Sequence, residues 1–229
     1  MTMGKKIYGF YLVVTMNDWK KVFLDQINYL VNSDLFNNTE KLYLRVFYSD
    51  ENELFFIQNL IKNYTKIYLT STKINEFEFG ILDLLQNISL EENFYCYYFH
   101  TKGVSIDKNN VFKYHKSNDL TNLKINVESW RKYMEYFLID KFQNCLEVLD
   151  NNYDACGVQY TTNPKEHFSG NFWWSKSEYI KKLPKINSLD KTRRHNAEFW
   201  IGSGNGNLKG LFHTNQAGYR QTVKENYKN

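Results

Sequence analysis

Residues Asn93–Ser105 read NFYCYYFHTKGVS, and this stretch decides the fold. Its aromatic and apolar run, Phe94–Phe99, stops abruptly at the polar segment His100–Gly103. A short run rich in aromatic residues is typical of a strand that is buried on both faces. Ligands of open α/β sheets bind outside the carboxyl ends of such strands. The stretch therefore predicts a central strand with functional groups at its end, although an ordinary polar turn after a strand has the same pattern.

Three units of strand and helix precede this strand. The predicted strands are Ile7–Thr15, Leu42–Tyr48 and Lys66–Leu69. Apolar residues recur at helical spacing after each of them, and the third such stripe comprises Ile74, Phe77, Ile81, Leu84 and Ile88. Four βα-type units in succession imply parallel strands, right-handed crossovers and helices on both faces. The sequence thus predicts an α/β fold with a central, mainly parallel sheet.

The second half of the chain is less regular. We expect a polar excursion over residues 106–126, a long helix at Val127–Leu149 and a fifth strand at Tyr153–Tyr160. A glycine- and aromatic-rich segment, HFSGNFWW, covers residues 167–174 and precedes helices expected at 175–183 and 193–201. The sequence shows no internal repeat and no clear boundary, so we expect a single domain over residues 1–229.

Composition and charge restrict the function. The 229 residues are 42% hydrophobic and 24% charged, as in ordinary globular proteins. The 17% aromatic content is high and favours stacking surfaces for sugars or bases, although an AT-rich genome produces the same bias. The net charge of +4, from 29 basic and 25 acidic residues, argues against a nucleic-acid-binding protein and suits a small anionic ligand.

The cysteines and the N-terminal run bear on location. Cys96, Cys145 and Cys156 lie in apolar segments without CxxC spacing, which indicates buried, reduced thiols. No apolar run reaches about 18 residues, so we expect no transmembrane helix. The apolar run near the N-terminus lacks a small-residue cleavage site and is interpreted as the first strand rather than a signal peptide. These observations together predict a cytoplasmic protein.

Several familiar catalytic motifs are absent. The sequence has no GxGxxG after the first strand, no GxxxxGK[ST] and no GxSxG, which argues against a Rossmann dehydrogenase, a P-loop enzyme and an esterase-type hydrolase. The Gly202–Gly206 run does not follow a predicted strand and indicates a turn. The five histidines, which argue by their scattered spacing against a structural zinc site, are His100, His115, His167, His195 and His213.

Three features occur in a recognisable order: the polar end of the fourth strand, the Ser169–Asn171 loop, and the late acidic residue Glu198. This arrangement, over roughly residues 5–201, resembles the GT-A fold of nucleotide-sugar glycosyltransferases. It is most similar to the inverting, family 2-like members and their HTKG- and SGNFWW-bearing relatives of bacteria and large viruses. The resemblance implies transfer of a sugar from a UDP-, GDP- or dTDP-linked donor to a hydroxyl of a glycan acceptor, with inversion.

The resemblance also implies roles for individual residues. It divides the domain into a nucleotide-binding half, residues 1–105, and an acceptor half, residues 127–213. Donor binding would fall to Thr15, Asn17, Asp50, His100, Thr101, Lys102 and Gly103. Acceptor binding would fall to His167, Ser169, Gly170, Asn171, Trp173 and Trp174. Glu198 would be the catalytic base that deprotonates the acceptor hydroxyl.

The sequence departs from the family pattern at the metal site. His100-Thr101-Lys102 stands where relatives carry the DxD motif that holds a divalent metal on the diphosphate. An oxygen-ligand site for Mg²⁺ or Mn²⁺ cannot be built from this motif alone, because histidine and lysine are not carboxylates. Lys102 would instead neutralise the diphosphate directly. We favour transfer without a metal, with Mn²⁺ or Mg²⁺ left open and His100 and His213 as the candidate ligands.

Each of these roles has a simpler explanation. Burial among apolar neighbours is expected to raise the pKa of Glu198 and make it a better base, but an anion also suits the first turn of a helix. Trp173 and Trp174 offer flat faces to sugar rings, or else belong to the core. Arg193 and Arg194 can meet phosphate, or else are simply solvated.

Two alternative functions come from other classes. A non-catalytic carbohydrate-binding protein on the same fold would use the segment at 167–174 as its sugar platform. A nucleic-acid-binding protein would use the aromatic residues and lysines, and its affinity would depend steeply on salt.

Overall fold

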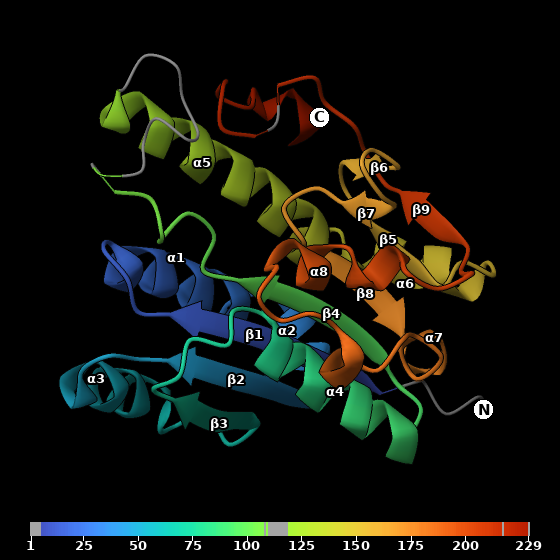
Figure 1. Ribbon diagram of the computed structural model, residues 1–229, viewed down its shortest axis with the longest axis horizontal. Coiled ribbons are helices and arrows are strands. Elements are labelled where there is room, and N and C mark those ends of the chain that lie inside the picture. The colour runs from blue at the N-terminus through green and yellow to red at the C-terminus, as the bar shows by residue number, and fades with distance from the viewer. Residues whose placement is uncertain (1–5, 108, 110–118, 217, 229) are drawn as a thin grey trace.

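The computed structural model describes residues 6–107, 109, 119–216 and 218–228. Its main sheet has seven strands in the order β3-β2-β1-β4-β8-β5-β9 (Figure 1). The strands are β1 (Ile7–Val14), β2 (Lys41–Phe47), β3 (Ile67–Thr72), β4 (Tyr95–His100), β5 (Ala155–Gly157), β8 (Trp173–Lys176) and β9 (Leu208–Gly210). Only β8 pairs antiparallel with its neighbours in this sheet, and all other pairs are parallel. The predicted α/β class and mainly parallel sheet are confirmed.

Helices cover both faces of the sheet. One face packs against α1 (Trp19–Val31), α2 (Asp34–Asn38), α3 (Glu51–Ile61), α5 (Leu120–Glu135), the π-helical turn η2 (Tyr136–Asp140) and α6 (Phe142–Asp150). The other packs against α4 (Phe79–Glu91), α7 (Ser177–Ile180), η3 (Ile186–Ser188), α8 (His195–Glu198) and η4 (Trp200–Gly202). The small pair β6 (Tyr160–Thr161) and β7 (His167–Phe168) and the turn η5 (Glu225–Lys228) complete the described elements.

Strand β4 joins the two halves of the chain. It pairs in parallel with β1 on one side and antiparallel with β8 on the other. Tyr97 and Phe99 face one hydrophobic cluster, whereas Cys96 and Tyr98 face the other. All four side chains are fully buried, so the aromatic run is buried on both faces as predicted. Its polar end therefore lies at the middle of the sheet's carboxyl edge.

The predicted helical stripe after the third strand is only partly correct. Helix α4 begins at Phe79, and Ile74 and Phe77 precede it in a loop where both are exposed. The Phe77 backbone is left-handed, with φ of 50°, and its N–H donates to the Asn75 side chain at 3.0 Å. A side chain bonded to its own turn competes with helix formation, and here the turn prevails.

Other predicted boundaries shift because local patterns continue across breaks. The long helix predicted at 127–149 begins at Leu120 and is interrupted by the η2 turn, and the fifth strand divides into β5 and β6. The helices predicted at 175–183 and 193–201 shorten to α7 and α8. Residues 108 and 110–118 of the predicted excursion at 106–126, including His115, lie outside the described residues, and its last part, residues 120–126, belongs to α5.

Side-chain capping differs between the helices. Asp50 caps α3, where its side chain and that of Glu53 form a reciprocal capping box. Asp18 stands before α1 without a capping hydrogen bond. Asn196 lies inside α8, and its side-chain amide donates to the Asp190 carbonyl at 2.9 Å.

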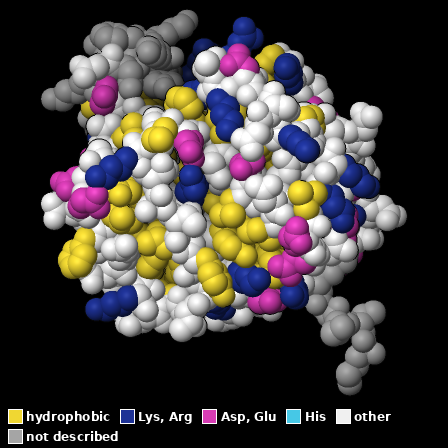
Figure 2. Space-filling view, turned by 60° about the horizontal axis from the view of Figure 1, so that its bottom comes forward, with side chains coloured by type: hydrophobic (Ala, Val, Ile, Leu, Met, Phe, Trp, Pro, Cys, Tyr) yellow, Lys and Arg dark blue, Asp and Glu magenta, His cyan; other side chains and the backbone are white. Residues whose placement is uncertain are grey.

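The surface mixes charged and hydrophobic side chains, and the thiols are buried, as the composition and the sequence around the cysteines predict. The face shown in Figure 2 has hydrophobic side chains near its centre, with acidic and basic side chains mixed around them. Cys96, Cys145 and Cys156 are buried and form no disulfide. Within the described ranges, no helix has both the length and the apolar composition needed to span a membrane.

Candidate functional site

A cleft of about 200 Å³ opens at the carboxyl ends of β1 and β4. Five segments that are distant in the sequence line it: the end of β1, the turn after β4, the loop before α4, α8 with its N-cap, and the C-terminal segment at Tyr219. The polar side chains along it are Asn75, Glu78, His100, Thr101, Lys102, Ser105, Arg194, Glu198 and Tyr219. This is the place at which an open α/β sheet binds its ligands.

The turn after β4 aims Lys102 into this cleft. The Thr101 N–H donates to the Leu12 carbonyl at 3.0 Å, and the Thr101 hydroxyl accepts from the Val14 N–H at 2.9 Å. Gly103 then adopts φ of 92°, and a Cβ there would lie 2.4 Å from Val127 Cγ1, so only glycine fits. Thr101, predicted to bind the donor, is buried and ties β4 to β1. It positions Lys102.

Lys102 keeps its charge inside the cleft. Its Nζ lies 4.7 Å from the ring centroid of Trp130 and 5.8 Å from that of Tyr219, within cation–π range. Burial lowers the pKa of Lys102, but Tyr219, Glu198 and Glu78 outweigh burial and raise it above its ordinary value. A fixed cation therefore stands among two carboxylates and two aromatic rings.

His100 is neutral in this environment. Burial, followed by the charges of Lys102 and Arg194, holds its pKa well below the ordinary range. Its Nδ1 is buried and has no hydrogen-bond partner among the described residues. The ring lies against Phe172, with centroids 5.2 Å apart. His100 therefore lines the cleft as a neutral group, and Lys102 carries the positive charge of the predicted motif.

Glu198 lines the same cleft as Lys102. Its Oε1 accepts from the Gly170 N–H at 3.4 Å, and its Oε2 lies 3.3 Å from His195 Nδ1. Burial raises the pKa of Glu198, but Lys102 and then the hydrogen bond from His195 outweigh burial, so the net pKa lies below its ordinary value. The predicted increase in pKa is therefore wrong, and Glu198 is ionised at neutral pH.

A second carboxylate, Glu78, lines the cleft and was not predicted. Its Oε2 accepts from the Tyr98 hydroxyl at 3.0 Å and from the Asn171 side-chain amide. Burial and then the charge of Glu198 raise the pKa of Glu78 above its ordinary value. The sequence around it, EFEFG, does not distinguish Glu78 from Glu76, which pairs with Arg45 at 2.6 Å instead.

The Ser169–Asn171 loop lies behind the cleft rather than along it. Gly170 has φ of 96°, and a Cβ there would lie 2.4 Å from Met134 Sδ. Gly170 and Asn171 are buried, and each holds one carboxylate. The Ser169 N–H donates to the Gln159 carbonyl at 3.0 Å. Gly170 and Asn171 therefore position Glu198 and Glu78, and neither is exposed as the predicted acceptor surface requires.

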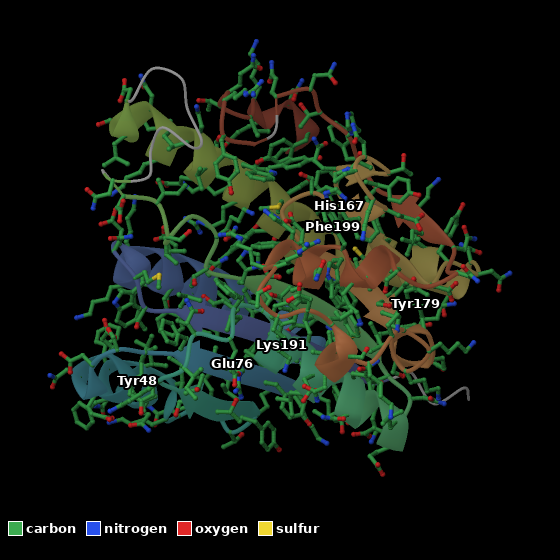
Figure 3. All side chains as sticks on the ribbon, in the orientation of Figure 1. Tyr48, Glu76, His167, Tyr179, Lys191 and Phe199 are labelled. Atoms are coloured by element: carbon green, nitrogen blue, oxygen red, sulfur yellow. The ribbon has the colours of Figure 1, made fainter. Side chains whose placement is uncertain are left out.

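The predicted aromatic platform is part of the core. Trp173 and Trp174 are each 1% exposed. The indole of Trp173 donates to Asn171 at 2.7 Å, and that of Trp174 donates to the Leu138 carbonyl at 2.9 Å. The prediction that they stack on sugars is wrong, because β8 runs between β4 and β5 and carries both rings inward. His167 is also buried, with its ring centroid 5.0 Å from that of Phe199 (Figure 3).

The predicted nucleoside residues gather beside the cleft. Asn17 and Asp50 line one shallow pocket, and Asn17 also lines a second pocket that includes Lys102. Asn17 donates to the Val104 carbonyl at 2.7 Å and so fixes the turn after β4. Thr15, which was predicted to bind the donor, is buried. Its hydroxyl donates to Glu53 at 2.6 Å and is therefore already engaged within the protein.

The two candidate metal ligands, His100 and His213, do not line one cleft. The described residues include no cluster of three or more His, Cys, Asp or Glu side chains suited to one ion. His213, a predicted candidate ligand, follows β9 and does not line the cleft with His100. The donor set in the cleft instead pairs carboxylates with a lysine and an arginine.

The fold and the cleft define an α/β protein with a charged site at the carboxyl edge of its sheet. The family described as Domain of unknown function (DUF8361) matches residues 93–225, more than half of the chain. The protein belongs to this family. The matched region begins just before β4 and includes Lys102, the Ser169–Asn171 loop and Glu198. No curated protein matches the sequence.

Proposed function

We propose that this protein is a glycosyltransferase of the GT-A type, which moves a sugar from a nucleotide diphosphate sugar to a hydroxyl of a glycan. The observation that carries the proposal is that Lys102 and Glu198 line one cleft. Lys102 and Arg194 supply positive charge for a diphosphate, and Glu198 supplies a proton acceptor. A site with both kinds of group suits a ligand that is anionic at one end and rich in hydroxyls at the other.

The reaction would be a single displacement. The acceptor hydroxyl oxygen attacks the anomeric carbon, its proton passes to Glu198, and the bond between that carbon and the phosphate oxygen breaks. The bonding electrons leave with the nucleoside diphosphate, whose added negative charge Lys102 and Arg194 stabilise. His100 would donate a hydrogen bond to the same phosphate. Glu198 is ionised before the reaction, so it is ready to accept the proton and to orient the hydroxyl.

The nucleoside would lie over the neighbouring pockets. Asn17 and Asp50 line a pocket that shares Asn17 with a second pocket, and this second pocket shares the turn at Lys102–Val104 with the cleft. The three pockets therefore lie next to one another, and a nucleotide sugar that spans them would extend from Asp50 to Glu198. This adjacency supports a nucleotide sugar over a free monosaccharide.

Two measurements test the proposal. The first is a thermal-shift screen against UDP, GDP and dTDP, with and without Mn²⁺. One of the three nucleotides should raise the melting temperature, since a ligand of the native state stabilises it by mass action. Incubation with the matching nucleotide sugar and a glycan mixture should then release the nucleoside diphosphate. A protein that binds glycans but no nucleotide would contradict the proposal and favour the non-catalytic carbohydrate-binding alternative.

A further inference from the structure

The loop before α4 presents an exposed aromatic ring at the cleft. Phe77 lines the cleft and is 40% exposed. Its φ of 50° is a conformation that bulky residues rarely adopt, so the fold holds this ring at a cost in backbone energy. Strained residues of this kind concentrate at ligand sites. With Trp173 and Trp174 buried, Phe77 offers an aromatic face that the sequence did not single out.

The next residue, Glu78, presents a carboxylate to the same cleft. Oε2 is held by Tyr98 and Asn171, and Asn171 is itself held by the Trp173 indole. This chain of hydrogen bonds runs back into the core and fixes the direction of the carboxylate. Ionised carboxylates only accept hydrogen bonds, so the group suits hydroxyl donors. It repels phosphate, which the cations Lys102 and Arg194 attract instead.

We infer that Phe77 and Glu78 form the wall that binds the sugar ring of the donor, with the ring's C–H face on Phe77 and its hydroxyls on Glu78. A pyranose has an apolar face and a rim of hydroxyl donors, which matches one aromatic face beside one acceptor. The inference rests on the proposed function, because it assumes that the diphosphate lies on Lys102. It assigns recognition of the sugar to the segment before α4 rather than to the HFSGNFWW segment.

The test compares affinity for the nucleotide with and without its sugar. Calorimetry would measure Kd for UDP, GDP and dTDP and for UDP-glucose, UDP-galactose, GDP-mannose and dTDP-rhamnose. The wild type should bind one nucleotide sugar about tenfold more tightly than its diphosphate, as one charge-assisted hydrogen bond and one ring contact permit. Phe77→Asn and Glu78→Gln should each remove most of that gain and leave affinity for the diphosphate within about twofold.

Matched controls and stability separate binding from folding. Phe55→Asn removes another exposed phenylalanine, which is 64% exposed on α3, and Glu147→Gln removes an exposed glutamate on α6. Both should keep the full gain from the sugar. Asparagine tolerates a left-handed backbone better than phenylalanine, so Phe77→Asn should not lower the melting temperature.

Two results would overturn the inference. If both Phe77→Asn and Glu78→Gln keep the full gain, or lose affinity for the diphosphate and the nucleotide sugar equally, the sugar does not lie on this wall, although the proposed function stands. If the wild type binds none of these probes, the proposed function fails and the inference fails with it.

Discussion

The side-chain amide of Asn171 donates a hydrogen bond to the carboxylate of Glu78. The preceding residue, Gly170, donates its backbone N–H to Glu198. Two carboxylates from distant parts of the chain are thus held by consecutive residues of one buried loop. Their pKa values diverge, with that of Glu78 raised and that of Glu198 lowered. Such divergence is a common sign of groups with different tasks.

The bond between Asn171 and Glu78 should be sensitive to charge. Asn171→Asp keeps the shape and the tolerance for its φ of 59°, but it places a second carboxylate against Glu78. We expect a loss of at least about 2 kcal/mol in the free energy of unfolding, since a buried hydrogen bond to a charged group is removed. Urea unfolding measures this loss. Asn144→Asp, at an exposed position of α6, is the control and should change little.

Removing the charge of Lys102 should weaken nucleotide binding. Lys102→Met should raise Kd for the nucleoside diphosphate by at least about tenfold, because no other lysine lines the cleft in the described part of the chain. Lys62→Met, at an exposed position after α3, serves as the matched control in the same titration. Equal affinity in the two variants would show that the diphosphate lies elsewhere.

Glu198→Gln should separate binding from chemistry. The amide keeps the size of the side chain but cannot take the acceptor proton, so we expect the transfer rate to fall about 10²–10⁴-fold. Affinity for the nucleoside diphosphate should stay near that of the wild type. Single-turnover kinetics with the nucleotide sugar measure the transfer rate, and calorimetry measures the affinity for the nucleoside diphosphate. A variant that transfers at the wild-type rate would exclude Glu198 as the base.

The raised pKa of Glu78 predicts how stability depends on pH. A carboxyl whose pKa is higher in the folded than in the unfolded state binds more protons when folded, so its contribution to stability is full at low pH. That contribution is lost as the pH rises from the ordinary pKa of glutamate through the raised pKa of Glu78 in the folded state. Glu78→Gln removes this titration. Its melting temperature relative to the wild type should therefore be higher at pH 7.5 than at pH 4.

A fifth expectation concerns the loop backbone. Gly170→Ala places a Cβ 2.4 Å from Met134 Sδ at a φ of 96°. Overpacking of this kind costs about 1–3 kcal/mol, and the strained backbone adds to it. Chemical denaturation should show this loss, together with weaker transfer, because the loop positions Glu198. An alanine variant as stable as the wild type would mean that the loop relaxes freely.

Much of the fold could be predicted because it depends on local patterns. The run at Phe94–Phe99 is aromatic or apolar at every position. A run this short with no polar position is explained by a strand that is covered on both faces. Lys102 could be predicted as a site residue because it lies directly after the end of this strand. By contrast, Ile74 and Phe77 continue the helical spacing of α4, yet a side-chain turn at Asn75 keeps both outside the helix, which begins only at Phe79. Hydrophobic periodicity alone does not reveal that a side-chain turn competes with the helix.

By itself, the sequence determined the alternation of strands and helices and the polar turn at the end of β4. These depend on the spacing of apolar residues within one segment, which is a local property. The tertiary structure alone decided which side chains meet Lys102, and that the tryptophans of β8 face the core. Glu78 and Glu198 lie far apart in the chain, and they share a cleft because β8 pairs with β4 and brings the Gly170–Asn171 loop between them.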